Sequence, residues 1–377
     1  MPSLVRRFQH ASTEEQPFEL NIQMESPPLV MYGNPDVSSG ALASGLAKLT
    51  VFPADLKCES IVMEFVRIIS TKRPLRDSCP DCKAQVEAFE KWEFSKEPTV
   101  YTHGTHTWPF TFIIPGHFPQ TTNSPFINVT YILKTRVKIP SQPDFVFEYP
   151  LNLKRSIVTN ADKIAQRLFP PTSLIALLEL PPVIHPLSCV PVEFQLTGVK
   201  PENSKVGWRL TKISWRIEEQ IKAQINGCST HTGTKKPYIF KETRLLGNNE
   251  HKSGWKEDGD RIIFEIPIST SLLSKPICDV SFDGQFSLYI AHQLILETIV
   301  VEVMNSHPIN SNARILRMKV NLPLTERGGL GVSWDEECPP MFNSVGPSPP
   351  AYEQVARSSP TDIPLPPPSC PTNVQRD

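Results

Sequence analysis

The chain has 377 residues, with 38 basic and 39 acidic side chains and a formal net charge of −1. Nucleic-acid binding depends on an excess of basic side chains, which a net charge close to zero does not provide, so we expect no nucleic-acid partner. The length suggests about two domains of about 100–200 residues each, and 39% hydrophobic side chains are enough to fill their cores. Eight scattered cysteines, of which only Cys79 and Cys82 are close together, do not fit a disulfide scaffold and indicate a reducing, cytosolic compartment.

The sequence shows neither a secretion signal nor a membrane span. Residues 1–10 contain two arginines but no apolar core, and the most apolar later run, residues 294–304, is broken by Glu297 and Glu302. We therefore expect a protein that is neither secreted nor membrane-spanning.

The first half of the chain has the period-two alternation of β-strands. Residues 1–16 are polar and aperiodic, and we expect a flexible N-terminal arm there. Within residues 17–160 the alternation predicts strands at Phe18–Ile22, Leu49–Phe52, Ile61–Ile69, Trp108–Ile114, Ile127–Ile139 and Leu151–Lys154. These strands predict one β-sandwich.

The second half repeats this pattern after a break. Residues 161–171 end in Pro170-Pro171, which cannot lie in a central strand, so we expect a linker. Within residues 172–325 the predicted strands are Leu174–Leu180, Val192–Leu196, Thr211–Ile217, Ile262–Ile266, Phe286–Ile290, Leu294–Val303 and Leu316–Leu322. The predicted fold is therefore all-β, with a second β-sandwich in this half.

The last stretch, residues 326–377, holds 11 prolines and only scattered apolar side chains. Such a composition cannot bury enough surface to offset the entropy of ordering, which predicts a disordered tail.

A short motif in this tail, Pro349-Pro350-Ala351-Tyr352, suggests a partner. Adjacent prolines hold an extended polyproline II conformation before any partner binds, and Pro-Pro-x-Tyr is the ligand type of WW domains. A Pro-rich tail can also contain such a string by chance. We favour the functional interpretation and assign WW-domain binding to Pro349, Pro350 and Tyr352.

Two residue pairs raise the question of a metal. Cys79 and Cys82 are separated by two residues, as are His103 and His106 further along. These are tetrahedral zinc donors, but the histidine spacing is tighter than the usual gap of about three to five residues. A loop with free thiols and a strand start with solvent-facing imidazoles explain the same residues. We favour that interpretation, so the sequence assigns no metal ligand.

Catalytic motifs are missing from the sequence. It contains no phosphate-binding glycine loop, no H-E-x-x-H and no G-x-S-x-G, and the glycines at 328–331 follow a strand but open no helix. We therefore expect no enzymatic activity, no catalytic residue and no cofactor.

Several stretches together resemble a known family. Gly104 to Pro115, with its alternating Trp108, Phe110, Phe112 and Ile114, followed by Phe118-Pro119, Ser124 and Tyr131-Ile132-Leu133, resembles the N-terminal domain signature of the arrestin clan. Further stretches are similar to the low-dye-binding branch of fungal arrestin-related trafficking adaptors (alpha-arrestins): Thr71–Pro74, Cys79-x2-Cys82, Trp92, Phe169–Thr172, Pro182–Pro186, Trp208–Leu210 and Trp215–Glu219. The resemblance covers roughly residues 45–325.

The resemblance implies two arrestin-type sandwiches and a ubiquitin-ligase adaptor. Such adaptors recruit a Nedd4-type HECT ligase through its WW domains to the cytosolic tails of nutrient transporters, amino-acid transporters among them. The transporter is then ubiquitinated, endocytosed and sorted to the vacuole. The implied location is the cytoplasm, with peripheral recruitment to the plasma membrane, Golgi and endosomes. The alternative is an arrestin-like cargo-sorting or receptor-desensitising scaffold that does not depend on a ligase.

Overall fold

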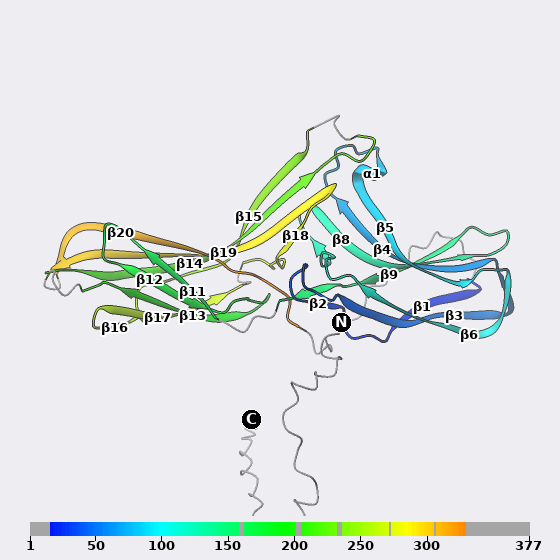
Figure 1. Cartoon of the computed structure of the whole chain (residues 1–377), viewed down its shortest axis with the longest axis horizontal. Helices are drawn as coiled ribbons and strands as arrows, with labels where there is room; N and C mark the ends of the chain where they lie inside the picture. The colour runs from blue at the N-terminus through cyan, green and yellow to red at the C-terminus, as the bar shows by residue number, and fades with distance from the viewer. Residues whose placement is uncertain are drawn as a thin grey trace, which may run out of the picture. The chain divides into compact units, whose positions relative to one another are not determined.

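The computed structural model describes the backbone of six segments: residues 16–157, 162–200, 205–231, 236–270, 273–304 and 307–328. Side chains are described for the same residues except 307–312. The predicted arm lies outside these residues apart from Gln16, as does the predicted tail apart from residues 326–328. The described residues belong to one compact unit, built almost entirely of β-strands (Figure 1). Its one described helix, α1 (Pro80–Lys83), is a single turn, and no helix in the described segments is long and apolar enough to cross a membrane.

The first half of the chain forms a β-sandwich of two facing sheets. One sheet has the order β1-β3-β6, with β1 (Phe18–Met24), β3 (Ala41–Cys58) and β6 (Thr99–Ile114). The other has the order β5-β4-β8-β7, with β9 also paired to β8; its strands are β4 (Ser60–Thr71), β5 (Ala84–Ser95), β7 (Thr122–Asn123), β8 (Ile127–Lys138) and β9 (Phe145–Leu151). A parallel pair, β2 (Val30–Tyr32) and β10 (Lys154–Ser156), completes this half.

The second half forms another sandwich. One sheet has the order β11-β12-β13-β17-β16, with β11 (Lys163–Leu168), β12 (Ile175–Leu180), β13 (Cys189–Thr197), β16 (Lys256–Asp258) and β17 (Arg261–Ser269). The other has the order β15-β14-β19-β18, with β20 also paired to β19; its strands are β14 (Val206–Ile225), β15 (Tyr238–His251), β18 (Val280–Phe282), β19 (Phe286–Met304) and β20 (His307–Asn321).

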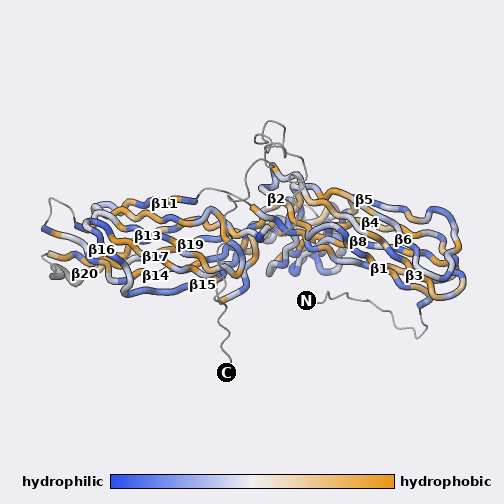
Figure 2. The backbone as a smooth tube through the Cα atoms, turned by 90° about the horizontal axis from the view of Figure 1, so that it is seen from below, coloured by the Kyte–Doolittle hydropathy of each residue, from blue (hydrophilic) through white to orange (hydrophobic). Residues whose placement is uncertain are grey.

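Alternation along the strands produces the two-layer arrangement. In β8, Val129, Tyr131 and Leu133 are buried while Thr130 and Arg136 are exposed, as a strand with one dry face requires. Figure 2 shows the same alternation of hydrophobic and hydrophilic positions in many of the strands. The prediction of an all-β fold with two sandwiches is confirmed.

Two sequence predictions need correction. The segment 161–171 is not only a linker, because β11 lies within it and pairs with β12. Its apolar side chains Ile164 and Leu168 are 65% and 60% exposed, so this edge strand carries no buried face that a hydrophobic pattern could reveal. The predicted strand at 151–154 is in fact a boundary, where β9 ends at Leu151 and β10 begins at Lys154.

The longest strands, β14 and β19, belong to both hydrophobic cores. They pair antiparallel along their whole length, from Val206 opposite Met304 to Ile225 opposite Phe286. At one end Ile225 and Phe286 lie in the core of the first sandwich, whereas Trp215 and other residues beyond the midpoint lie in the core of the second. Figure 1 shows β14, β15 and β19 extending from the second sandwich towards α1 of the first. The two sandwiches are therefore joined by a continuous hydrogen-bonded ladder.

We predict that Phe286→Ala destabilises the protein by about 3–5 kcal/mol, because it leaves a cavity in the first core although the residue belongs to β19. Tyr289→Ala is the matched control, since Tyr289 on the same strand is 44% exposed and should cost about 1 kcal/mol or less. Denaturant unfolding of the full chain measures both variants. Equal losses of unfolding free energy in the two variants would show that β19 contributes nothing to the first core.

Candidate functional site

The predicted ligase-docking residues Pro349, Pro350 and Tyr352 lie outside the described residues. The structure does show where the chain that leads to them leaves the sandwiches. The Thr325 hydroxyl donates to the carbonyl of Arg155 at 2.9 Å, and the amide of Glu326 donates to the same carbonyl at 3.2 Å. On the other side, the amide of Ile184 donates to the Pro323 carbonyl at 2.9 Å. The segment after β20 is thus held by both sandwiches.

Arg155, which anchors this segment, is a buried residue with only 7% of its surface exposed. It donates to the backbone carbonyls of Gly33 at 2.8 Å, Gly116 at 2.6 Å and Phe118 at 2.9 Å. Burial lowers the pKa of Arg155, because removal from water disfavours the charged form. Arg155 therefore joins two loops of the first sandwich to the chain that enters the tail.

A second buried group of charges lies where β14 and β19 pass from one core to the other. Glu219 and His292 are register partners, and both side chains are fully buried. The imidazole Nε2 of His292 lies 3.2 Å from a Glu219 carboxylate oxygen, and its Nδ1 lies 2.5 Å from Asp279. Glu219 also accepts from Arg244 Nε at 2.7 Å. The imidazole contacts two carboxylates, and Arg244 pairs with one of them, so protonation of the imidazole makes the four groups together electrically neutral.

These neighbours shift the pKa of both buried partners. Burial disfavours the His292 imidazolium, but hydrogen bonds to Asp279 and Glu219 outweigh it, so the pKa of His292 is raised. Burial also disfavours the Glu219 carboxylate, but hydrogen bonds from His292, the Ile277 amide and Arg244 leave the pKa of Glu219 lowered. Both shifts favour the charged forms, and the network thus behaves as a buried ion pair at the junction.

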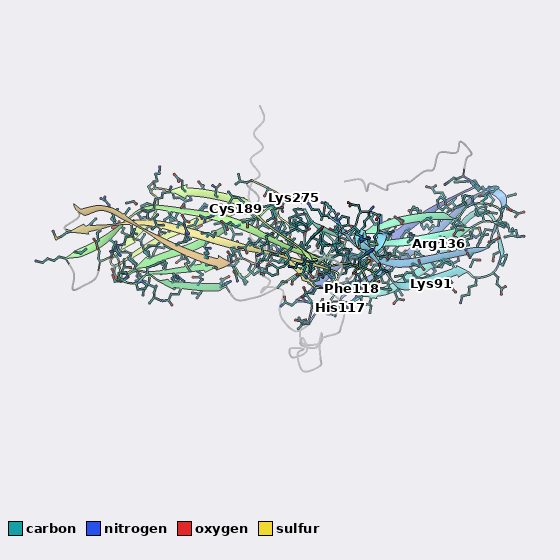
Figure 3. The ribbon with its side chains drawn as sticks, turned by 90° about the horizontal axis from the view of Figure 1, so that it is seen from above. Lys91, His117, Phe118, Arg136, Cys189 and Lys275 are labelled. Carbon is teal, nitrogen blue, oxygen red and sulfur yellow. The ribbon has the colours of Figure 1, made fainter. Side chains whose placement is uncertain are left out.

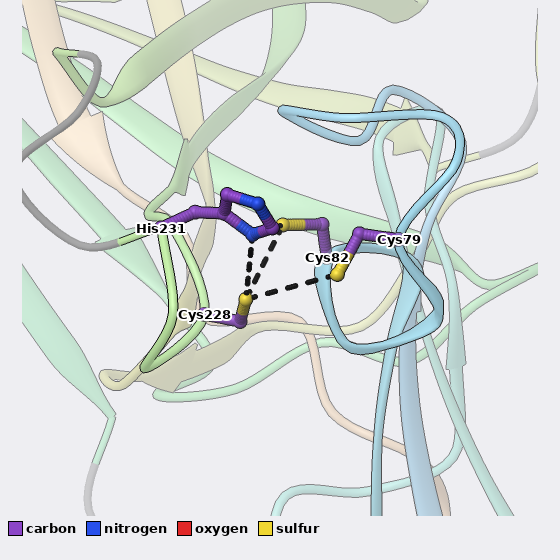
Figure 4. Close-up of side chains that lie close together, drawn as sticks. All are labelled: Cys79, Cys82, Cys228 and His231. Atoms are coloured by element: carbon purple, nitrogen blue, oxygen red, sulfur yellow. Dashed lines mark hydrogen bonds between the residues drawn. The ribbon is translucent and has the colours of Figure 1, made fainter.

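A third cluster contains the predicted cysteine pair. Cys79 is the N-cap of α1 and Cys82 lies within α1, in the connection from β4 to β5, and two further donors come from the connection after β14. We name the set the thiol–imidazole cluster: Cys79, Cys82, Cys228 and His231. Its four donor atoms all lie within 4.8 Å of one another, and Figure 4 shows the side chains converging from the two connections.

The individual distances within the cluster are short. The Cys228 sulfur lies 3.8 Å from that of Cys79 and 3.6 Å from that of Cys82. The Nδ1 atom of His231 lies 3.1 Å from the Cys228 sulfur and 3.6 Å from that of Cys82. The Thr230 hydroxyl approaches Cys228 to 3.0 Å. This is a donor set that could hold a thiophilic metal ion.

The electrostatics of the two central thiols differ. A hydrogen bond with Thr230 lowers the pKa of the Cys228 thiol to about 6, with burial opposing the shift and His231 reinforcing it. Burial raises the pKa of the Cys82 thiol, although a backbone hydrogen bond from Cys228 opposes the shift.

The other two metal candidates from the sequence do not join this cluster. His103 and His106 lie on β6, where His103 Nδ1 contacts the Phe52 carbonyl and His106 Nε2 contacts the Thr102 carbonyl, each at 2.9 Å. The histidine that accompanies the cysteines is His231, which a second x2 spacing, Cys228-x2-His231, could have indicated. The sequence analysis assigned no metal ligand in that stretch.

Comparison with known proteins places the chain among arrestin-like sequences. The family LDB19, described as arrestin N-terminal like, matches residues 61–234. An uncharacterized protein of Schizosaccharomyces pombe is 39% identical over 343 residues, which cover 88% of this chain and 94% of that protein.

Two relatives carry the printed name Protein LDB19. The protein of Eremothecium gossypii is 30% identical over 235 residues, covering 56% of this chain and 33% of the relative. The protein of Saccharomyces cerevisiae is 25% identical over 317 residues, covering 57% of this chain and 38% of the relative. The matched regions thus span 33% and 38% of these two longer proteins.

We predict that Arg155→Met destabilises the protein by about 3 kcal/mol or more, because it leaves several buried carbonyls without a donor. Arg136→Met is the matched control. Arg136 lies on the first sandwich (Figure 3) with a half-exposed ion pair to Asp144 at 4.0 Å, so its loss should cost about 1 kcal/mol or less. Denaturant unfolding compares the two, and equal costs would contradict an anchoring role for Arg155.

We predict that the stabilisation provided by His292 decreases as pH rises. Because the folded-state pKa of His292 is raised, its contribution is fully present below the unfolded pKa of about 6.5 and is lost as pH rises through the folded-state pKa. The difference in unfolding free energy between wild type and His292→Gln should therefore shrink with rising pH. Urea unfolding across a pH series measures it, with His103→Gln as an exposed control. A difference that stays constant or grows would contradict a charged imidazole.

Proposed function

Because the chain belongs to the LDB19-type family of arrestin-like proteins, we propose that it is a trafficking adaptor for a Nedd4-type HECT ubiquitin ligase. In this proposal the Pro-Pro-x-Tyr motif docks the WW domains of the ligase, and the sandwiches bind the cytosolic tails of plasma-membrane nutrient transporters, amino-acid transporters among them. Ubiquitin transfer to the transporter then leads to its endocytosis and vacuolar sorting. The adaptor supplies no catalysis of its own.

The observation that carries this proposal is the presence of Pro349, Pro350 and Tyr352 after an arrestin-like body. Two adjacent prolines limit the conformations that binding must select, and a tyrosine two positions later supplies both an aromatic face and a hydroxyl for a WW-domain pocket. The motif therefore offers affinity at a low entropic cost.

The geometry of the described residues supports a tethering mechanism. The chain is held at Thr325 and Glu326 by backbone and side-chain hydrogen bonds, and Lys154 forms an ion pair with Glu326 at 3.3 Å. Twenty residues separate Gly328 from Pro349, so the motif can lie at most about 75 Å from Gly328, which follows this anchor by two residues. A tether of this length raises the effective concentration of a docked ligase at the bound cargo to about the millimolar range.

The cellular location follows from the same proposal. An adaptor of this kind works in the cytoplasm and reaches the plasma membrane, Golgi and endosomes by peripheral binding to its cargo. Its partners are the ligase, ubiquitin and the transporter tails.

We predict that Tyr352→Ala weakens binding of the full chain to the ligase WW domains by about thirtyfold or more, which corresponds to about 2 kcal/mol for an interface tyrosine. Phe342→Ala is the matched control, since Pro339-Pro340-Met341-Phe342 has two prolines but no tyrosine, and its loss should leave binding unchanged. Isothermal titration measures binding, and transporter half-life in cells measures the output.

The two measurements separate the alternatives. Unchanged WW-domain binding by Tyr352→Ala would refute ligase docking through the motif. Lost binding with an unchanged transporter half-life would instead favour a cargo-sorting or receptor-desensitising scaffold that works without the ligase.

A further inference from the structure

We propose that a single Zn²⁺ ion binds between the two sandwiches, held by three thiolates and one imidazole: those of Cys79, Cys82, Cys228 and His231. The ion would connect the β4–β5 hairpin of the first sandwich to the β14–β15 hairpin of the second. This site is independent of the proposed ligase docking, since it involves no residue of the tail.

The spacing of the donor atoms matches a tetrahedral site. With Zn–S bonds of about 2.3 Å and Zn–N bonds of about 2.0–2.1 Å, tetrahedral geometry places sulfur atoms about 3.8 Å apart and sulfur about 3.6 Å from nitrogen. The sulfur–sulfur distances from Cys228 are 3.6 and 3.8 Å, and the sulfur–nitrogen distances to His231 are 3.1 and 3.6 Å. Small adjustments of the side chains would place all four donors around one ion.

The chemistry of the donors selects the metal and the kind of site. Three sulfur donors and one imidazole favour zinc over magnesium or calcium, which prefer oxygen ligands. Each half-site supplies two ligands with two intervening residues, a spacing found in structural zinc sites. Four protein ligands fill a tetrahedral shell and leave no open position for a substrate. The site is therefore structural, and it is consistent with a protein that performs no catalysis.

A disulfide explains the cluster less well. A disulfide bond is about 2.05 Å long, much shorter than the sulfur–sulfur distances of 3.6 and 3.8 Å. Three thiols also cannot all pair within one cluster, and a disulfide gives no role to His231. Packing of the thiols as small apolar groups is the other explanation, but among the residues that the structure describes only Leu75 joins Cys82 and Cys228 as a buried apolar member of this cluster. Metal binding alone accounts for all four donors.

The contacts around the cluster indicate what the ion would do. Cys82 and Cys228 are 146 residues apart in sequence, so a shared ion closes a very long loop. Beside it, the Gln285 side chain donates to the Asp81 carbonyl at 2.6 Å, and the Asn226 amide donates to the Gln285 carbonyl at 2.9 Å. The ion would reinforce a junction that already has direct hydrogen bonds. We therefore expect its removal to loosen the two hairpins while the sandwiches stay folded.

Metal analysis of the full chain tests the proposal. Protein purified under reducing conditions without chelator should contain about one zinc per chain. The double variant Cys228→Ser/His231→Ala should bind zinc at least about tenfold more weakly. Two matched controls should retain the metal: Cys189→Ser, which removes an exposed cysteine of the second sandwich (Figure 3), and His103→Ala/His106→Ala, which removes the x2 histidine pair on β6.

A second measurement keeps the test independent of how the double variant folds. Wild-type protein is stripped with a chelator and titrated with Co²⁺, which should give the strong visible bands of a tetrahedral, thiolate-bound ion at one equivalent and lose them when Zn²⁺ is added. In parallel, limited proteolysis should cut the β4–β5 and β14–β15 connections faster in stripped than in zinc-loaded protein.

Several outcomes would overturn the proposal. Wild-type protein that neither contains zinc nor takes up Zn²⁺ or Co²⁺ would do so, as would equal metal content in the wild type and the double variant. Peptide mapping that finds a disulfide between Cys82 and Cys228 in place of metal, in protein kept under reducing conditions, would also contradict it.

Discussion

The pairing of β14 with β19 is the constraint on which the described structure depends, and the buried contact of Glu219 with His292 lies where this ladder passes from one core to the other. On one side of this contact the ladder fills the first core, and on the other side it fills the second. A break in the ladder would therefore disturb both sandwiches at once. The buried charges cost free energy on removal from water, and hydrogen bonds to Asp279 and Arg244 offset that cost.

Other contacts reinforce the same junction and give the proposed adaptor a defined geometry. Gln120 of the first sandwich donates to the Asp279 carbonyl at 3.0 Å, next to the buried charges. Phe126 and Phe240, from different sandwiches, stack with ring centroids 5.1 Å apart. Arg155 fixes the start of the segment that continues to the proposed docking motif. A ligase bound there would work at a limited distance from cargo held by the sandwiches, which is what tethered ubiquitin transfer needs.

Much of this fold could be predicted from the sequence, because strands with one buried face carry a period-two pattern. The pattern failed where burial did not alternate or where polar residues are buried. β11 was missed because its two large apolar side chains, Ile164 and Leu168, face solvent. β19 was divided into two strands at His292, which is polar in sequence but buried against Glu219 and Asp279. The thiol–imidazole cluster was half visible: Cys79-x2-Cys82 stood out, but its partners Cys228 and His231 are brought to it only by the folded chain.

Hydrogen exchange along β14 and β19 tests most directly whether one ladder joins the two sandwiches into a single cooperative body. We predict that the amides of 221–225 and 286–290, in the first core, and those of 213–217 and 294–298, in the second, share one opening free energy to within about 1 kcal/mol. If the 221–225 and 286–290 segments instead open separately, at a free energy about 3 kcal/mol or more lower, the two sandwiches are independent domains and the central claim is wrong.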